Sequence, residues 1–363
     1  MATNPSNPTD VPAVLQQAHF PSLDGFRAVA ILAVVLSHVL YENQSIFVRR
    51  TGAWGVNLFF VLSGFLITTL LMRERMKHGR ISFRLFYVRR TLRIIPAALL
   101  FLVVMAALNS VYGLGISALG FLKAGLYLQN LPLPVPGNQW YLAHFWSLSV
   151  EEQYYLIAPA LLSIGFLAFR RFALAVIVAA HLVIYAIYHG YGESVALTYV
   201  DAIIKPIVPL TLGALAAELT MHGVLRVRPL GTLSSLALLI LSYLVFCGIP
   251  PFVPKLFVGT VSSLLLAWLV LSSIHRTDSV FFACLNAKVM TQLGVWSYSI
   301  YIWQQAFTHN EFLVTTASEP LTKALNLALL GIFAILSYRY FEQYFLRLKD
   351  RFSRVKSRPV DSR

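Results

Sequence analysis

The sequence GVNLFFVLSGFLITTLLM, residues 55–72, decides the fold class of this chain. It contains no Asp, Glu, Lys or Arg, and a helix of about 20 such residues crosses the hydrocarbon core of a bilayer. The following stretch, from Arg73 to Arg93, holds eight Lys or Arg residues, which is typical of a cytoplasmic loop. This pattern predicts a spanning helix that ends on the cytoplasmic side.

The composition of the whole chain repeats this pattern. Hydrophobic residues make up 58% of the 363 residues and charged residues 12%, whereas globular proteins average about 45–50% and about 25%. Soluble globular, disordered, collagen-like and coiled-coil proteins are therefore excluded, and an all-α polytopic membrane protein is predicted. Cys247 and Cys284 lie in apolar surroundings, so neither a disulfide nor a metal site is expected.

Further apolar segments of spanning length occur along the chain. We expect ten transmembrane helices, at residues 25–42, 55–72, 94–112, 146–168, 172–189, 201–222, 230–249, 255–274, 291–308 and 320–345. Segment 115–130 is short and precedes a Pro-rich stretch, so it is predicted to be re-entrant or interfacial.

The distribution of basic residues sets the orientation. With both termini cytoplasmic, 23 of the 29 Lys and Arg residues lie inside and six outside, as the positive-inside rule requires. Counting 115–130 as a crossing would place Arg170 and Arg171 outside. The net charge of +14 is thus explained mainly by topology, and no nucleic-acid partner is predicted.

The two ends are predicted to lie outside the membrane domain. Residues 1–20 contain no Lys or Arg and are expected to be a disordered tail, because a signal peptide begins with basic residues. The transmembrane domain is placed at 21–346. The basic segment 347–363 is expected to contact anionic lipids of the inner leaflet.

Ionisable residues inside a membrane are costly and indicate function. Asp24 and Arg27 begin the first span and His38 follows eleven residues later. Eleven helical steps return Arg27 and His38 to one face, about 16 Å apart. A snorkelling Arg and an interfacial His explain the spacing equally well.

The quoted span contains polar and small residues. Ser63 and Gly64 favour close helix packing, and Asn57 is a candidate polar contact at the outer end. In the inner loop, Arg90 and Arg93 are neighbours at i and i+3. They suit phosphate binding, although membrane anchoring explains them as well.

The start of the fourth span carries two adjacent acids. Trp146, Ser147, Glu151 and Glu152 lie in the sequence WSLSVEE, residues 146–152. Adjacent helical residues point apart, so only one acid is expected to face a cavity. Packing does not explain these acids, and function is the favoured interpretation.

A late aromatic segment, residues 294–305, ends another span. An interfacial aromatic belt is its default explanation. Tyr298 and Tyr301 nevertheless share a face at i and i+3 and are candidate cavity-lining residues.

Together these motifs resemble the membrane-bound acyltransferase family 3, the sugar O-acetylases. The matching pieces, in family order, are Leu23–Arg27 with His38, Gly55–Leu66, Arg90 with Arg93, Trp146–Tyr155 and Ser297–Trp303. The chain departs from the family pattern at Asn57, where Asp is common, at Gln304, where His is frequent, and at Gln343–Tyr344 after Glu342. No esterase-like domain follows, which implies a stand-alone core.

The resemblance implies transfer of an acyl group, usually acetyl, from cytoplasmic acyl-CoA to a hydroxyl of a carbohydrate or glycolipid acceptor. It further implies ten spans and a bacterial cytoplasmic membrane. Acyl-CoA is then a co-substrate, and no permanently bound cofactor is expected. O-antigen, exopolysaccharide and peptidoglycan are among the acceptors that stay open.

In this mechanism Arg27, Arg90 and Arg93 bind the phosphates of CoA. His38 acts as general base or accepts the acyl group transiently, and Glu151 orients it. Asp24, Asn57, Ser63, Trp146, Ser147, Tyr298 and Tyr301 are the candidate cavity residues.

Two other classes of protein fit a polytopic chain. A glycan or lipid transporter or flippase would also bury polar residues, but no internal repeat of the kind common in transporters occurs. A non-catalytic scaffold or sensor would have no use for costly intramembrane charges.

Overall fold

The computed structural model describes residues 11–17, 19–40, 45–190, 203–275, 279–308 and 319–352. Within these ranges the chain is helical, and its extended structure is limited to one isolated bridge between Ile116 and Gly137. The all-α prediction is confirmed for this part of the chain.

The first half of the fold contains one short 3-10 turn and the longest helices. Its elements are η1 (Ala13–Leu15), α1 (Pro21–Val39), α2 (Ile46–His78), α3 (Phe83–Tyr112), α4 (Ala118–Gly125), α5 (Trp140–Ala143), α6 (Phe145–Ile164) and α7 (Phe166–Gly190). Both α2 and α3 end at a glycine with positive φ, Gly79 and Gly113, a conformation that glycine adopts without a steric penalty.

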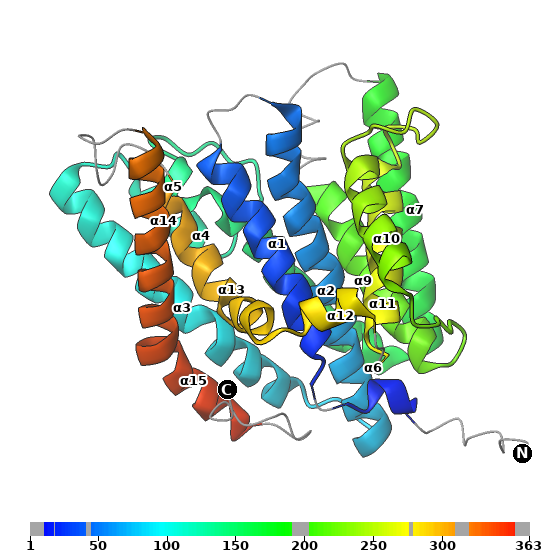
Figure 1. The fold of residues 1–363 in the computed structure, drawn as a ribbon. Helices are drawn as coiled ribbons and strands as arrows, with labels where there is room; N and C mark the ends of the chain where they lie inside the picture. The colour runs from blue at the N-terminus through cyan, green and yellow to red at the C-terminus, as the bar shows by residue number, and fades with distance from the viewer. Residues whose placement is uncertain are drawn as a thin grey trace, which may run out of the picture.

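The second half is built from shorter helices. They are α9 (Lys205–Met221), α10 (Thr232–Phe246), α11 (Val258–Ser273), α12 (Val280–Leu285), α13 (Lys288–Phe307), α14 (Glu319–Leu336), a π-helical turn η3 (Ser337–Glu342) and α15 (Gln343–Asp350). Figure 1 shows α14, η3 and α15 as one nearly continuous rod at the edge of the bundle.

Each of the ten predicted spans overlaps a helix of the described chain. Five helical segments are long and apolar enough to cross a membrane: Pro21–Val39, Ile46–His78, Phe83–Tyr112, Phe166–Ile187 and Pro320–Asp350. The membrane prediction is supported by these five. The count of ten spans and the side on which the termini lie stay predictions.

Segment 115–130 contains only the eight-residue helix α4. Eight residues rise about 12 Å, well short of the hydrocarbon core of about 30 Å. The side chain of Lys123 in α4 is buried and donates to the Leu133 carbonyl at 3.2 Å. This helix is therefore folded against its own connection, as expected of a segment that does not cross.

Helix α2 is the central element of the bundle. In its apolar stretch 78% of residues are buried, against 28% in α3 and 22% in α7. It packs on α1, α6, α9, α10 and α11, and Figure 1 places it between the two halves of the molecule. Residues 55–72, which decide the fold class, thus also form the middle of the core.

A close helix crossing joins α2 to α9. A Cβ atom added to Gly64 would overlap the Leu210 carbonyl, and one added to Gly213 would overlap the Val61 carbonyl. Backbones approach this closely only where side chains are absent. The packing role predicted for Gly64 is confirmed.

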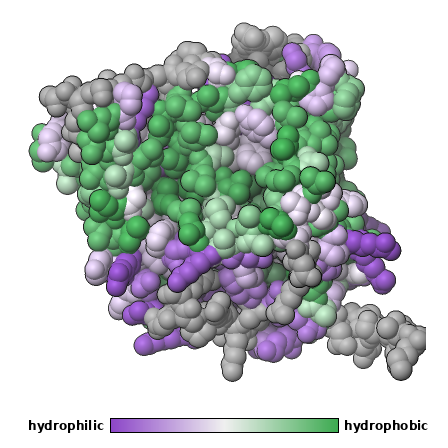
Figure 2. All heavy atoms as spheres, viewed as in Figure 1, coloured by the Kyte–Doolittle hydropathy of each residue, from purple (hydrophilic) through white to green (hydrophobic). Residues whose placement is uncertain are grey.

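The described ends of the chain, η1 and α15, lie at the same end of the bundle (Figure 1). Figure 2 shows a broad hydrophobic surface above them and hydrophilic residues gathered along that end. This arrangement is the one expected if both ends face one aqueous side.

The predicted domain limits at both ends stay predictions. Residues 1–10 and 353–363 lie outside the described residues. Within the segment predicted to be a disordered tail, Leu15 and Phe20 are buried and belong to the hydrophobic core. Helix α15 (Gln343–Asp350) runs across the limit predicted at 346.

Candidate active site

A pocket of about 100 Å³ opens between helices of both halves of the chain. Helices α2, α3, α6 and α13 form its walls, and Arg27 of α1 reaches it from the side. Its lining residues are Arg27, Val56, Phe59, Phe60, Ser63, Leu66, Ile67, Arg90, Arg93, Ile94, Ser147, Leu148, Glu151, Tyr155, Ser297, Tyr298 and Tyr301.

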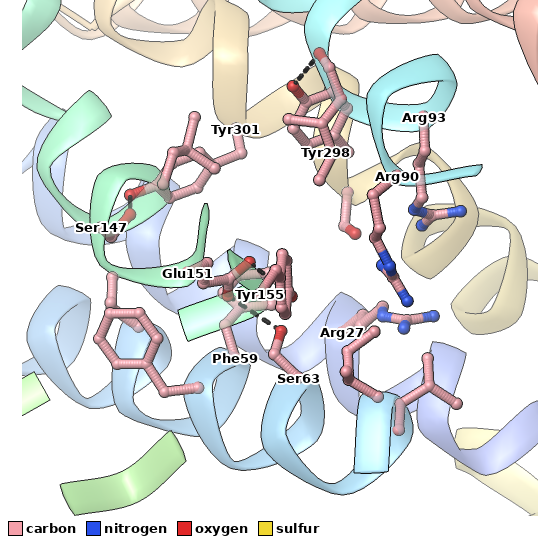
Figure 3. A pocket seen from close by; sticks show the side chains of 17 residues that line it. Arg27, Phe59, Ser63, Arg90, Arg93, Ser147, Glu151, Tyr155, Tyr298 and Tyr301 are labelled. Carbon is pink, nitrogen blue, oxygen red and sulfur yellow. Dashed lines mark hydrogen bonds between the residues drawn. The ribbon is translucent and has the colours of Figure 1, made fainter. Parts of the chain in front are cut away.

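Three guanidinium groups gather at one end of the pocket. Figure 3 shows Arg27, Arg90 and Arg93 together, opposite Ser147 and Tyr301. Arg27 is paired with Asp24 at 2.8 Å. Arg90 lies over the ring of Tyr155 at 5.0 Å, a cation–π contact.

Arg90 and Arg93 keep their hydrogen-bonding capacity for a ligand. In the described ranges neither forms a salt bridge with an Asp or Glu side chain. By contrast, Arg89 on the same helix is paired with Glu74 at 3.0 Å. Unpaired guanidinium groups at the mouth of a cavity are suited to an anionic ligand.

Glu151 occupies the middle of the pocket wall. Its carboxylate accepts hydrogen bonds from Ser63 Oγ at 2.9 Å and from Tyr155 OH at 3.2 Å. Ser63 is contributed by α2 and both other residues by α6, so the cluster also ties these helices together. Figure 3 shows this cluster between the arginines and Tyr301.

Hydroxyl groups line the end of the pocket away from the arginines. Ser147 Oγ and Tyr301 OH lie 2.5 Å apart, and Tyr301 OH also contacts the His144 carbonyl at 3.2 Å. Tyr298 donates to the Ile94 carbonyl of α3 at 2.7 Å. These bonds fix α13 against α3 and α6.

Most of the predicted site residues are brought together. Eight of them line this one pocket: Arg27, Ser63, Arg90, Arg93, Ser147, Glu151, Tyr298 and Tyr301. Glu152 does not line it, in agreement with the expectation that adjacent acids point apart.

Four predicted residues lie outside the pocket lining. Asp24 contacts it indirectly, through Arg27. Asn57 accepts a hydrogen bond from Ser263 Oγ at 3.0 Å and joins α2 to α11. Trp146 packs edge-on against Phe60, with 6.0 Å between ring centroids. Both contacts are explained by helix packing.

His38 is the fourth predicted residue that lies outside the pocket lining. It lies in the last turn of α1, half-buried, with its ring 5.7 Å from that of Trp140 in an edge-on contact. Glu151 is bonded to Ser63 and Tyr155 and has no hydrogen bond to His38 within the described chain. No contact therefore supports the expectation that Glu151 orients His38.

Two features of the site were missed by sequence reasoning. Phe59 and Tyr155 line the pocket, although nothing distinguishes them in sequence from other aromatic residues of spans. His144 is 2% exposed and holds a hydrogen bond to Gln305. Its position beside the WSLSVEE motif is the sequence feature that could have identified His144.

The described residues contain no group of three or more His, Cys, Asp or Glu side chains that could bind a metal. The chemical groups that the pocket offers are cations at one end, a carboxylate midway, hydroxyls at the other end and apolar walls. Such a pocket suits a long, thin ligand with an anionic end.

Comparison with known proteins identifies the family of this chain. A family model described as an acyltransferase domain matches residues 20–340. The chain belongs to this acyltransferase family. The family resemblance inferred from the five motifs is thereby confirmed.

Curated relatives of this chain share about a quarter of its residues. The peptidoglycan O-acetyltransferase OatA of Listeria monocytogenes is 27% identical, over 94% of this chain and 60% of its own. The putative peptidoglycan O-acetyltransferase YrhL of Bacillus subtilis is 28% identical, over 90% and 54%. A putative O-acetyltransferase of Staphylococcus aureus is 26% identical, over 90% and 57%.

The chain thus spans a little over half the length of these curated relatives. No solved structure matches it with significance.

Proposed function

We propose that this protein is an integral membrane O-acyltransferase of the bacterial cytoplasmic membrane. It transfers an acetyl group from cytoplasmic acyl-CoA to a hydroxyl of a carbohydrate acceptor. Three guanidinium groups at the mouth of a pocket with apolar walls carry this proposal. CoA combines phosphates with a long, thin pantetheine arm, and both parts match this lining.

The arginines bind the phosphates of the donor. Arg90 and Arg93 supply charge-assisted hydrogen bonds, which are about twice as strong as neutral ones. Arg27 adds a third positive charge, partly neutralised by Asp24. The predicted excess of positive charge on the cytoplasmic side attracts the same anionic donor.

Glu151 contacts the arm of the donor. A carboxylate accepts hydrogen bonds only, and the amide N–H groups of pantetheine are donors. Ser63 and Tyr155 hold the Glu151 side chain in place. This role replaces the orientation of His38 that the sequence had indicated.

His38 performs the chemistry as general base or transient acyl acceptor. As base, it takes the proton of the acceptor hydroxyl while the hydroxyl oxygen attacks the thioester carbon and CoA leaves as a thiolate. His38 lies about 16 Å along α1 from Arg27, a span that the pantetheine arm can cover. The names of the relatives OatA and YrhL favour peptidoglycan glycan strands as the first acceptor to test.

The donor site is tested with two donors, acetyl-CoA and acetyl-pantetheine, which lacks the phosphates beyond the arm. We expect Arg90→Ala to lower kcat/KM for acetyl-CoA by about 10–100-fold, the effect of losing a charged hydrogen bond. It should change acetyl-pantetheine turnover by less than twofold. Arg84→Ala removes an exposed arginine of the same helix outside the pocket and is the matched control. Equal losses with both donors would remove Arg90 from the phosphate site.

A glycan or lipid transporter is the competing function. It predicts that purified protein releases no CoA from acetyl-CoA and transfers no acetyl label. If the wild-type protein binds acetyl-CoA but releases no CoA or transfers no acetyl label, the transporter function is favoured.

A further inference from the structure

His144 has one satisfied and one unsatisfied ring nitrogen. It lies at the junction of α5 and α6, and its Nδ1 is 2.5 Å from Gln305 Oε1. Its Nε2 is buried and has no hydrogen-bond partner. The Ile302 carbonyl also faces the ring, but no hydrogen bond of acceptable geometry joins it to Nε2.

The hydrogen bonds of Gln305 fix which nitrogen of His144 carries the proton. Gln305 Oε1 accepts the backbone N–H of His144 at 2.9 Å, which sets the orientation of the amide, because an NH₂ group there would oppose another donor. Since Oε1 only accepts, Nδ1 must donate to it. In the neutral imidazole the proton is therefore on Nδ1, and Nε2 presents a lone pair.

Further buried polar atoms lie on the neighbouring helices. Both amide atoms of Gln304 on α13 and the Nδ1 of His38 on α1 are buried and, within the described structure, have no partner at full hydrogen-bond geometry. His38 and Gln304 are nevertheless close enough for a looser side-chain hydrogen bond to each other, His38 lies within electrostatic range of His144, and α1 packs against α13. Buried polar groups with poor hydrogen bonds are costly, so several on adjoining helices indicate a site for a polar ligand group.

The chemistry of these atoms selects a hydroxyl. The Nε2 lone pair of His144 requires a donor, whereas the amide nitrogen of Gln304 requires an acceptor, and a hydroxyl is both. A thioester carbonyl or a thiolate only accepts and would leave Nε2 unsatisfied. His38 is partly exposed, whereas His144 and Gln304 are buried, so a ligand would approach the cluster from the His38 side.

We propose that His144 and Gln304, next to His38, form a subsite for a second hydroxyl of the acceptor, in which His144 Nε2 accepts the hydrogen bond of that hydroxyl while His38 remains the base for the reacting hydroxyl. This inference rests on the proposed function and names the acceptor side of the same reaction. The ligand class is a hydroxyl of a glycan strand. Gln305 is a positioning residue, because it acts only through the tautomer of His144.

Two substitutions of His144 separate ligand binding from a structural role. Asn places its amide nitrogen near the position of Nδ1, so His144→Asn retains the bond to Gln305 and loses Nε2. Gln reaches the position of Nε2, so His144→Gln retains a polar atom there and loses the bond to Gln305. The subsite predicts that His144→Asn is the more defective enzyme, and a structural role predicts the reverse order.

The measurements use full-length protein in detergent with acetyl-CoA and soluble peptidoglycan glycan strands. For His144→Asn we expect kcat/KM for the strands to fall at least 10-fold. Acetyl-CoA affinity and CoA release without acceptor should stay within twofold of wild type. Unchanged use of the strands, or a larger defect in His144→Gln, would overturn the subsite.

Gln304→Met provides a second test in case His144 variants do not fold. It removes an unsatisfied buried amide, so Tm is expected to stay equal or rise while kcat/KM for the strands falls at least 10-fold. Retained use of the strands in a folded Gln304→Met protein would overturn the subsite, as would wild-type protein that binds acetyl-CoA and leaves the strands unmodified. Failure of the wild type to bind acetyl-CoA would instead contradict the proposed function itself.

Discussion

Individual side chains divide the site into regions of different charge. The donor end carries Arg90 and Arg93, the middle carries Glu151, and His38 with His144 lies toward the other end of α1. Each is positioned by a neighbour on another helix or by packing. A buried charge or lone pair in such a setting is costly unless a ligand uses it.

Glu151 and Glu152 provide a matched pair at the residue scale. Glu151→Gln removes the negative charge that faces the pocket, and we expect kcat/KM for acetyl-CoA to fall about 10–100-fold, as for loss of a charged hydrogen bond. Glu152→Gln removes the same charge one residue away, outside the pocket lining, and should retain activity within twofold. Steady-state kinetics with both purified variants checks this. Equal losses of kcat/KM in the two variants would show that the total charge of this segment matters, and that the position of Glu151 in the pocket does not.

Sequence alone identified all four charged residues among the 17 that line the pocket, because intramembrane charge is rare and costly. It did not identify Phe59 or Tyr155, since aromatic residues are common in spans for other reasons. It also connected Glu151 to His38, which the hydrogen bonds to Ser63 and Tyr155 do not support. Which side chains hydrogen-bond to each other across helices depends on how those helices cross. The spacing of residues along one helix does not reveal this.

Helices differ in how clearly their sequences reveal them. The apolar stretches of α2, α3 and α7 meet the length and composition expected of a span. Helix α13 is 20 residues long but carries Ser297, Tyr298, Gln304 and Gln305, so its mean hydropathy is lower. Two walls of the pocket, α2 and α3, are therefore evident as spans from sequence, whereas the polar residues of α13 make that wall less obvious.

The crossing of α2 and α9 is testable at the scale of elements. A Cβ on Gly64 meets backbone atoms of α9, which cannot rotate away, so Gly64→Ala should destabilise the protein by about 1–3 kcal/mol, as other overpacking substitutions do. Thermal unfolding in detergent should show Tm lowered by several degrees.

Gly331→Ala is the control for that prediction. A Cβ at Gly331 in α14 meets nothing within 4 Å, and alanine favours the helix by about 1 kcal/mol. Its Tm should be equal or higher. A Gly64→Ala protein as stable as wild type would mean that the two helices can separate without loss of packing.

The molecule as a whole has an apolar surface bounded by a hydrophilic end (Figure 2). The described ends of the chain lie there together (Figure 1). An even number of crossings has this consequence, and the basic residues predict that this end is cytoplasmic. The arginines that we propose for donor binding follow the same rule, so in this proposal orientation and donor binding use the same charges.

Cysteine labelling tests this orientation. Arg80 follows α2 and Lys255 precedes α11, and both are exposed. In a background with Cys247 and Cys284 replaced by Ala, Lys255→Cys should react with a membrane-impermeant maleimide in intact spheroplasts. Arg80→Cys should react only after permeabilisation. Labelling of both positions from the same side would contradict the ten-span topology.

Transfer of radiolabelled acetyl from acetyl-CoA to peptidoglycan glycan strands, by purified wild type and His38→Ala, tests the central claim most directly. Wild type is expected to label the strands. His38→Ala is expected to lose transfer, with acetyl-CoA binding and Tm retained, because His38 lies outside the donor pocket. Substantial transfer by His38→Ala would contradict the assignment of His38. Wild-type protein that binds acetyl-CoA but leaves the strands unlabelled would contradict these strands as the acceptor, and wild-type protein that binds no acetyl-CoA would contradict the acyltransferase itself.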